Sequence, residues 1–329
     1  MRPVGGCARA WPGRTLRGVQ SGSTMNEIDK KIEPFAPAVV ITGATQGIGR
    51  ALAEEFARFG HTLLLVARDE AKLAETAREL SAAHGVEVRF AACDLSTAEG
   101  CAGVEEALRR FGLYADILVN NAAMMMAGFF QDQDVAKIRR LIDLDVGAAV
   151  DLTLRFLPGM VARGRGGVLN VASMEGFMPV PYQAAYAAAK ASVLSLSRAL
   201  SYETMYTGVR VSVLAPGTTV TRLHAKAGAE NSRYLVLLPA MTSEELARIA
   251  YRKFKRGKRV IVPGFFNRLG VIAMRFVPDL LLVPFVGWLF RVRDAEGNLQ
   301  WPRPLKNPGS TSRRESSPAS AERGSGLRR

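Results

Sequence analysis

Short apolar runs alternate with longer amphipathic stretches along most of this 329-residue chain. Between the runs, apolar side chains return at helical spacing, as at Ile48, Leu52 and Phe56. Runs that are apolar throughout are typical of strands buried on both faces, in parallel sheets covered by helices. The pattern therefore predicts one α/β domain, doubly wound around a seven-stranded parallel sheet. The predicted strands are Val39–Thr42, Leu63–Ala67, Val86–Ala91, Ile117–Asn120, Val168–Ala172, Val209–Leu214 and Val260–Val262.

A glycine-rich turn joins the first predicted strand to the helix that follows it. Gly43 permits a tight turn, Gly47 lets the backbone approach a diphosphate, and Gly49 lets the helix pack closely on the strand. The helix start offers free N–H groups and the positive end of its dipole. The spacing G-x-x-x-G-x-G differs from the commoner G-x-G-x-x-G, and a turn without a ligand is the alternative. The strand before it and the helix after it favour nucleotide binding.

Tyr186 and Lys190 are four residues apart and therefore share one face of a helix. An ammonium near a phenol lowers the pKa of the phenol, so Tyr186 can exchange a proton with a carbonyl or alcohol oxygen near neutral pH. Ser173 precedes Tyr186 by thirteen positions and can hydrogen-bond the same oxygen. A tyrosine and a lysine on an ordinary helix are the alternative, because the pair is a weak pattern by itself.

Taken together, these features resemble the classical short-chain dehydrogenase/reductase family. The resemblance covers residues 38 to about 264, with motifs in the family's order and near its spacing. It implies a Rossmann-type fold and NAD(P)-dependent oxidation or reduction of alcohols and carbonyls. The motifs are Thr42–Gly49, Asp94–Leu95, Asn120–Ala123, Ser173, Tyr186, Lys190 and Pro216–Gly217.

The resemblance also implies roles for individual residues. Tyr186 is expected to be the catalytic acid/base, Lys190 to lower its pKa and hold the nicotinamide ribose, and Ser173 to orient the substrate oxygen. A homodimer or homotetramer that pairs through helices near 135–162 and 182–206 is expected on the same ground. The expected cofactor-binding residues are Gly43, Thr45, Gln46, Gly47, Ile48, Gly49, Arg68, Asp94, Leu95, Asn121, Ala122, Tyr186, Lys190, Pro216, Gly217 and Thr221.

Asp145 departs from the family's pattern. Many members have an asparagine at this place, in the helix before the Ser173 strand, where it supports a water-mediated proton relay to the lysine. A carboxylate accepts hydrogen bonds from water but donates none while it is ionised, and it favours the charged form of Lys190 if the two are close. We count Asp145 with the catalytic residues and hypothesise a working relay with altered pH dependence. Weakened activity is the alternative.

Arg68, directly after the second predicted strand, bears on the choice of cofactor. An acidic residue there would bind the ribose 2′-hydroxyl of NAD(H), whereas an arginine accommodates the 2′-phosphate of NADP(H). Asp69 follows, but it fits better as the N-cap of a helix over Glu70–His84. We therefore expect NADP(H) rather than NAD(H), with a solvated loop charge as the alternative for Arg68. By resemblance, Asp94 contacts the adenine, and Asn120–Ala123 shapes the adenine side.

Both ends of the chain differ from its middle in composition. The formal net charge is +14, and the ends carry nine of these charges: four at residues 1–25 and a net five at residues 302–329. The high charge is therefore poor evidence for nucleic-acid binding, since no nucleic-acid motif accompanies it. We expect a basic disordered leader at 1–34, which is an unstructured extension or an upstream start with Met25 as the initiator, the catalytic domain at 35–264, and a disordered tail at 302–329.

Residues 265–301 form an apolar extension beyond the expected catalytic domain. Arg268, Arg275 and Asp279 interrupt it, and Pro278 and Pro284 break it, so a full membrane span is not expected. A substrate lid, an oligomer contact and a helical hairpin in the membrane interface remain open. The segment at about 218–241, which lies over the nicotinamide and substrate in the family's fold, is apolar at 234–238 and indicates a hydrophobic carbonyl or alcohol substrate, with a packing element over the cleft as the alternative.

The cysteines, histidines and methionines bear on metal binding, cellular location and the substrate site. The three cysteines and three histidines are scattered, which indicates neither a metal site nor a disulfide framework and suits the cytoplasm, with or without peripheral membrane contact. Met124–Met126 is either core filler or a pliable wall of the substrate site. The predicted function is an NADP(H)-dependent oxidoreductase of ketones, aldehydes or secondary alcohols. A non-catalytic nucleotide-binding or membrane-associated scaffold is the alternative.

Overall fold

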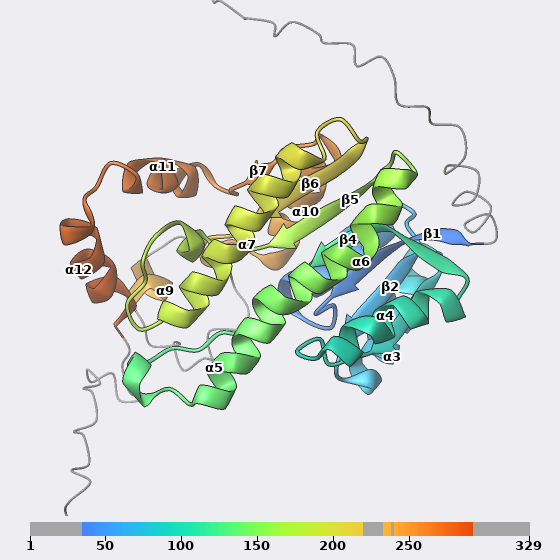
Figure 1. Ribbon diagram of the computed structural model, residues 1–329, viewed down its shortest axis with the longest axis horizontal. Helices are drawn as coiled ribbons and strands as arrows, with labels where there is room; N and C mark the ends of the chain where they lie inside the picture. The colour runs from blue at the N-terminus through green and yellow to red at the C-terminus, as the bar shows by residue number, and fades with distance from the viewer. Residues whose placement is uncertain (1–34, 220–232, 238–239, 292–329) are drawn as a thin grey trace, which may run out of the picture.

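The computed structural model describes residues 35–219, 233–237 and 240–291. Seven parallel strands form one sheet in the order β3-β2-β1-β4-β5-β6-β7 (Figure 1), which confirms the predicted architecture. The direction of strand order reverses between β1 and β4, and open α/β sheets bind ligands at such a switch point. The strands are β1 Ala36–Thr42, β2 Leu63–Ala67, β3 Val88–Ala92, β4 Leu113–Asn120, β5 Gly166–Val171, β6 Val209–Leu214 and β7 Val260–Ile261.

Helices cover both faces of the sheet (Figure 1). α2 and α10 pack together on one face beside α3, whereas α4, α6 and α7 cover the other. The described helices are α2 Gly47–Arg58, α3 Glu70–His84, α4 Ala98–Arg110, α5 Val135–Ile142, α6 Ala148–Ala162, α7 Ala184–Glu203, α9 Arg233–Leu237, α10 Ser243–Lys255, α11 Phe265–Met274 and α12 Asp279–Phe290.

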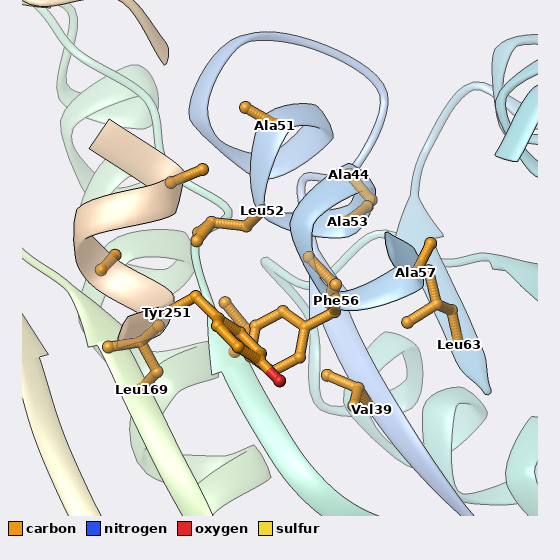
Figure 2. Close-up of a cluster of buried hydrophobic side chains, with 14 of the residues drawn as sticks. Val39, Ala44, Ala51, Leu52, Ala53, Phe56, Ala57, Leu63, Leu169 and Tyr251 are labelled. Atoms are coloured by element: carbon orange, nitrogen blue, oxygen red, sulfur yellow. The ribbon is translucent and has the colours of Figure 1, made fainter. Parts of the chain in front are cut away.

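Successive side chains of β1 point to opposite faces of the sheet, so the core has two layers. Val39 and Ile41 pack towards α2 and α10, while Ala38 and Val40 pack towards α4 and α6. Figure 2 shows the first layer, in which the ring of Phe56 meets that of Tyr251 edge-on with centroids 5.0 Å apart. Full burial of a side chain such as Phe56 contributes about 1.5–3 kcal/mol to stability. This layer fixes α2, and with it the glycine turn, against the sheet.

Side-chain caps fix the starts of two predicted helices. The carboxylate of Asp69 accepts a hydrogen bond of 3.1 Å from the backbone N–H of Lys72, so the predicted N-cap of α3 is confirmed. Thr242 caps α10 in the same way, through the N–H of Glu245 at 3.2 Å. Such caps stabilise a helix by about 1 kcal/mol. Asp69 is therefore engaged by its own helix.

The part of the apolar extension that the structure describes, residues 265–291, folds into two helices beyond the sheet. After β7 the chain turns at Gly264, whose φ is +85°, and enters α11 and then α12, at the left of Figure 1. The inner face of α12 packs Val286 and Phe290 against Tyr234 of α9. Among the helices that the structure describes, none is long and apolar enough to cross a membrane.

Candidate active site

A cavity of about 1830 Å³ extends from the glycine turn to α11 and α12. Asp145 does not line it, and Thr221 lies outside the described residues. The residues of the predicted site that line the cavity are Gly43, Thr45, Gln46, Gly47, Ile48, Gly49, Arg68, Asp94, Leu95, Asn121, Ala122, Ser173, Tyr186, Lys190, Pro216 and Gly217. The structure thus brings together residues that are far apart in the sequence.

The glycine turn forms one end of this cavity. Gly43 and Gly47 have φ values of +65° and +53°, a region that favours glycine. A Cβ atom on Gly49 would lie 2.2 Å from the carbonyl oxygen of Gly43, so a larger residue does not fit there. The amide of Asn121 donates to the carbonyl oxygens of Thr42 at 2.9 Å and Gly43 at 3.2 Å. This cradle fits the diphosphate of a dinucleotide, because it brings backbone and the start of α2 close to the cavity.

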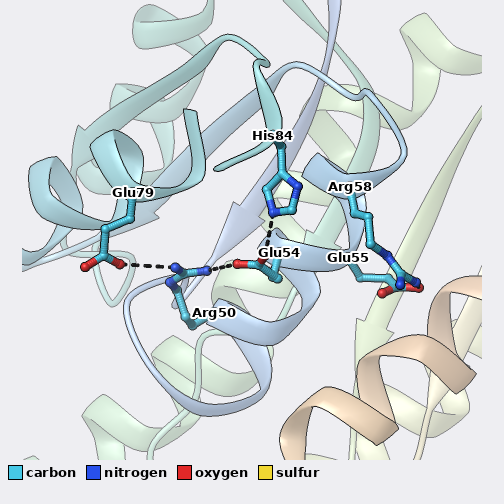
Figure 3. A network of polar contacts seen from close by, with 6 residues as sticks. All are labelled: Arg50, Glu54, Glu55, Arg58, Glu79 and His84. Carbon is cyan, nitrogen blue, oxygen red and sulfur yellow. Dashed lines mark hydrogen bonds and ion pairs between the residues drawn. The ribbon is translucent and has the colours of Figure 1, made fainter. Parts of the chain in front are cut away.

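Three arginines lie near this end of the cavity, and they differ in whether a carboxylate pairs with them. Arg50 is held by Glu54 at 2.8 Å and Glu79 at 3.1 Å (Figure 3). Arg140 pairs with Asp94. Within the described part of the chain, Arg68 makes no ion pair, although it lines the cavity. Arg68 is therefore the arginine best placed to meet a phosphate.

The carboxylate of Asp94 lies at the same end. Burial by itself raises the pKa of Asp94, but hydrogen bonds from Ser96 and the charges of Arg140 and Arg68 outweigh it, so the net shift is downward. Asp94 is therefore ionised at neutral pH and can accept hydrogen bonds. Its backbone carbonyl packs against α4, where a Cβ on Gly100 would lie 1.9 Å from the oxygen.

Tyr186 and Ser173 meet where β5 ends and α7 begins. Ser173 follows β5 and caps a 3₁₀ turn, Met174–Phe177. Tyr186 is buried in the first turn of α7. The pKa of Tyr186 is raised well above its ordinary value by burial and by the carboxyl groups of Glu175 and Asp145, while a hydrogen bond with Ser173 lowers it. The expectation that Lys190 makes this phenol acidic is therefore wrong for the polypeptide by itself.

The ammonium of Lys190 is engaged elsewhere. Its Nζ lies 2.9 Å from Oδ2 of Asp145 and donates to the carbonyl oxygen of Val171 at 3.3 Å. It is 5.5 Å from the centre of the Tyr186 ring. A buried carboxylate holds this charge, which explains why the phenol gains little from it.

A π-helical turn places Asp145 behind Lys190. The turn, Asp143–Gly147, interrupts the otherwise continuous helix of α5 and α6, and such turns occur often at functional sites. Oδ1 of Asp145 accepts a hydrogen bond of 2.8 Å from the N–H of Met124. Burial raises the pKa of Asp145 above its ordinary value, against the opposing effect of Lys190. Asp145 and Lys190 are thus as close to each other as the relay hypothesis requires.

Sequence reasoning missed Glu175. It lies two residues after Ser173, is buried, and lines the cavity beside Tyr186. Burial raises its pKa to about 8, although the charge of Lys190 opposes the shift. The available signal was an acid inside an otherwise apolar run that follows the predicted serine strand. Met124–Met126 packs with Tyr186 and Leu141 in a buried cluster, as core filler does.

The end of the cavity at α11 and α12 is apolar. Tyr234 of α9 lines it, with its ring stacked on that of Phe290 at a centroid distance of 4.3 Å. α11, α12 and the link between them form the outer wall. Their cavity-lining residues include Phe266, Gly270, Met274, Val277, Leu281, Phe285, Val286, Trp288 and Leu289.

Comparison with known proteins adds a family to this geometry. The family model described as short chain dehydrogenase matches residues 37–232. A curated relative from Danio rerio, dehydrogenase/reductase SDR family member 7B, is 34% identical over 206 residues. That match covers 60% of this chain and 66% of the relative, so about a third of the relative lies outside it.

Solved structures agree with the sequence match. A short-chain dehydrogenase from Sphingobium yanoikuyae in complex with NADPH is 36% identical, with a TM-score of 0.66 over 73% of this chain and 94% of that one. The bulky-bulky ketone specific alcohol dehydrogenase from Comamonas testosteroni is 32% identical, with a TM-score of 0.62 over 73% and 93%. The chain thus belongs to the short-chain dehydrogenase/reductase family of NAD(P)-dependent oxidoreductases.

Proposed function

We propose that this protein is an NADP(H)-dependent reductase of hydrophobic ketones or aldehydes, able to run in reverse on secondary alcohols, with Tyr186 as the acid/base. The observation that carries the proposal is the continuous cavity. It joins the glycine cradle to an apolar chamber, and Ser173 and Tyr186 stand between the two. A scaffold without catalysis would not need a buried phenol and hydroxyl at that junction.

The nicotinamide nucleotide supplies the hydride when it is bound. Ser173 holds the substrate oxygen by a hydrogen bond, and the phenol of Tyr186 gives its proton to that oxygen. The upward pKa shift of Tyr186 keeps the phenol protonated near neutral pH, which is the state that reduction requires. Lys190 also binds the ribose in this proposal, as the family resemblance implies.

Asp145 is proposed as part of a proton relay through Lys190. Its contact of 2.9 Å with the lysine supports this role. Asp145→Asn should shift the pH dependence of kcat without abolishing turnover, because the amide keeps the shape but removes the charge. An unchanged profile would remove Asp145 from the mechanism, and a large loss without a shift would assign it a structural role.

Cofactor selection is proposed to rest on Arg68. The guanidinium lines the nucleotide end and is not engaged by a carboxylate of the described chain, whereas Asp69 is occupied as a helix cap. NADPH in the solved structure from Sphingobium yanoikuyae supports the same choice. The remaining predicted contacts, Thr221 among them, are proposed by family resemblance.

The extension at 265–301 is proposed as the substrate lid, following the catalytic domain at 35–264. The apolar residues of α11 and α12 on the cavity wall support this, as does the bulky-ketone activity named for the relative from Comamonas testosteroni.

The decisive experiment for the reductase activity measures NADPH oxidation with a panel of lipophilic ketones and aldehydes. Tyr186→Phe should lower kcat/KM by about 10²–10⁴-fold while NADPH still binds. Equal turnover by this variant would contradict the assigned role.

Self-association is proposed through α6 and α7. Their surface exposes large apolar side chains, including Leu154 at 68% and Tyr202 at 68%. Exposed side chains of this size are typical of contact surfaces. A homodimer or homotetramer in the cytoplasm is therefore proposed, and the mass in solution tests it. Leu154→Arg should lower that mass.

The outer face of α11 and α12 is proposed to rest on an anionic lipid surface. Phe265 and Phe266 are 73% and 74% exposed, and Phe276 and Leu280 are 81% and 84% exposed. Between residues 265 and 291 the acidic residue is Asp279, and the basic residues are Arg268, Arg275 and Arg291. An apolar face bordered by arginines complements anionic headgroups.

Vesicle co-sedimentation tests the lipid contact. The full chain should bind phosphatidylglycerol vesicles more tightly than phosphatidylcholine vesicles. Phe276→Ser with Leu280→Ser should release it, while Phe130→Ser, an exposed position outside α6, α7, α11 and α12, serves as the matched control. Equal binding by the double variant would reject the lipid contact. Loss of self-association in that variant would instead indicate a protein interface.

A further inference from the structure

Glu175 is fixed in the wall between the catalytic pair and the apolar chamber. The 3₁₀ turn that carries it is pressed against α7, where a Cβ atom on Gly176 would lie 2.8 Å from the carbonyl oxygen of Lys190. The backbone N–H of Glu175 donates to Oγ of Ser173 at 3.2 Å. The backbone of Glu175 is therefore fixed next to Ser173.

The Glu175 carboxyl group is buried and incompletely satisfied. Its Oε2 has no hydrogen-bond partner among residues 35–219, 233–237 and 240–291. The side chain nevertheless lines the cavity, beside Met178 and Tyr234. An unpaired buried polar atom destabilises a fold, so an apolar residue would suit a purely structural position better.

The groups around Glu175 come from two helices. Lys190 and Tyr186 face it from α7, and Tyr234 faces it from α9. α11 also packs against the 3₁₀ turn, and its charged residue is Arg268, with Arg275 at its end. Neither arginine contributes to the pKa shift of Glu175, and Arg268 donates to the carbonyl oxygen of Val262 at 2.9 Å. Lys190 is thus the one cation of the described chain that acts on Glu175, and Asp145 already pairs with it.

We propose that Glu175 is a polar subsite of the substrate chamber, which binds a second oxygen function that the substrate carries close to the carbonyl being reduced. The inference deepens the proposed reductase activity and rests on it. The substrate class is then a lipophilic hydroxyketone or dicarbonyl compound rather than a plain ketone.

The protonation state of Glu175 defines what it can recognise. With a pKa of about 8, the group is a neutral acid at pH 7. A neutral carboxylic acid donates one hydrogen bond and also accepts, so it can bind either a carbonyl or a hydroxyl oxygen. Above pH 8 it becomes an acceptor only, and it then repels a carbonyl oxygen while still accepting from a hydroxyl group.

Matched substrates test the inference. The probes are 2-decanone, 1-hydroxy-2-decanone, 4-hydroxy-2-decanone and 2,4-decanedione, with NADPH oxidation as the readout. The wild type should prefer at least one oxygenated ketone over 2-decanone by about tenfold in kcat/KM, the value of one neutral hydrogen bond. Glu175→Met should bring that ratio close to one, and the ratio is the readout because it does not depend on the absolute rate with 2-decanone. Glu175→Gln, which keeps a donor and an acceptor, should retain most of the ratio.

The pH dependence separates recognition from a packing effect. The wild-type preference for the dione should decline above pH 8 more steeply than that of Glu175→Gln, because ionisation of the dione itself affects both proteins equally. Glu244→Gln is the matched control, because Glu244 is an exposed carboxylate on the same cavity and should leave the ratio unchanged.

Three outcomes would overturn the inference. The first is that Glu175→Met leaves the kcat/KM ratio of oxygenated ketone to 2-decanone unchanged. The second is that the wild type reduces 2-decanone with the same kcat/KM as every oxygenated probe. Either result rejects the polar subsite and leaves the reductase activity standing. The third is a wild type that oxidises NADPH with none of the probes, which rejects both.

Discussion

The two ends of the cavity are built on different principles. At the nucleotide end, short motifs directly after β1, β2, β3 and β4 supply glycines and polar side chains, and the parallel sheet brings these strand ends together, as in the bond from Asn121 to Thr42. At the substrate end, α9, α11 and α12 supply apolar side chains that pack on one another beyond the sheet. The first end is thus determined by motifs at the ends of sheet strands, and the second by packing between helices.

The Lys190–Asp145 pair lies at the junction of the two ends and should give the largest effect. Lys190→Met should lower kcat/KM by about 10²–10⁴-fold, because the proton path and the ribose contact are both lost. It should also destabilise the fold by about 3–5 kcal/mol, since it leaves the carboxylate of Asp145 buried without its cation. Steady-state kinetics and thermal unfolding measure the two effects separately.

The double variant Lys190→Met with Asp145→Leu is the control for this effect. Stability should return towards that of the wild type, because no unpaired charge remains buried, while activity stays low. If the double variant is as unstable as the single one, the ion pair does not stabilise this junction as described.

A substitution at the nucleotide end should weaken binding of the cofactor and leave binding of the ketone unchanged. Arg68→Gln should raise the KM for NADPH by roughly 10–100-fold, the value of a charge-assisted hydrogen bond, and leave that for NADH almost unchanged. The KM for the ketone should not change. Arg50→Gln is the comparison, because Arg50 is held by Glu54 and Glu79 and should matter less. Equal effects of the two substitutions would reject the assignment of Arg68.

A change at the substrate end should have the opposite selectivity. Leu281→Ser with Phe285→Ser should raise the KM for a ten-carbon ketone by about tenfold, because part of the apolar wall is lost. The dissociation constant for NADPH should stay the same. A short ketone that does not reach α12 is the internal control, and a uniform loss with both ketones would indicate a folding defect.

A further expected effect concerns stability and pH. The folded chain keeps the proton of Glu175 up to about pH 8, whereas the unfolded chain releases it near 4.5. The unfolded state therefore binds fewer protons in this window, and the contribution of Glu175 to stability falls as pH rises from about 4.5 to 8. Glu175→Gln lacks this slope, so its Tm advantage should grow over the same range, by roughly 2–4 °C for each kcal/mol. A Tm difference that is independent of pH would contradict the upward pKa shift.

Sequence reasoning was most successful where structure depends on neighbours along the chain. The seven strands and the Asp69 cap follow from apolar runs and from one acid before a helix, and both are confirmed. The pKa of Tyr186 could not be derived in this way, because it depends on burial and on two carboxyl groups from other segments. The stacking of Tyr234 on Phe290 is equally non-local, which is why the role of 265–301 stayed open.

Gly264 marks a natural point for exchanging parts between members of this family. The sheet ends with β7 just before it, and the outer wall of the chamber follows it in α11 and α12. A graft that replaces everything after Gly264 would leave the glycine turn, Ser173, Tyr186 and Lys190 in place. Under the proposed function, such a graft would exchange the outer wall of the chamber at a single joint and keep the residues to which hydride transfer is assigned.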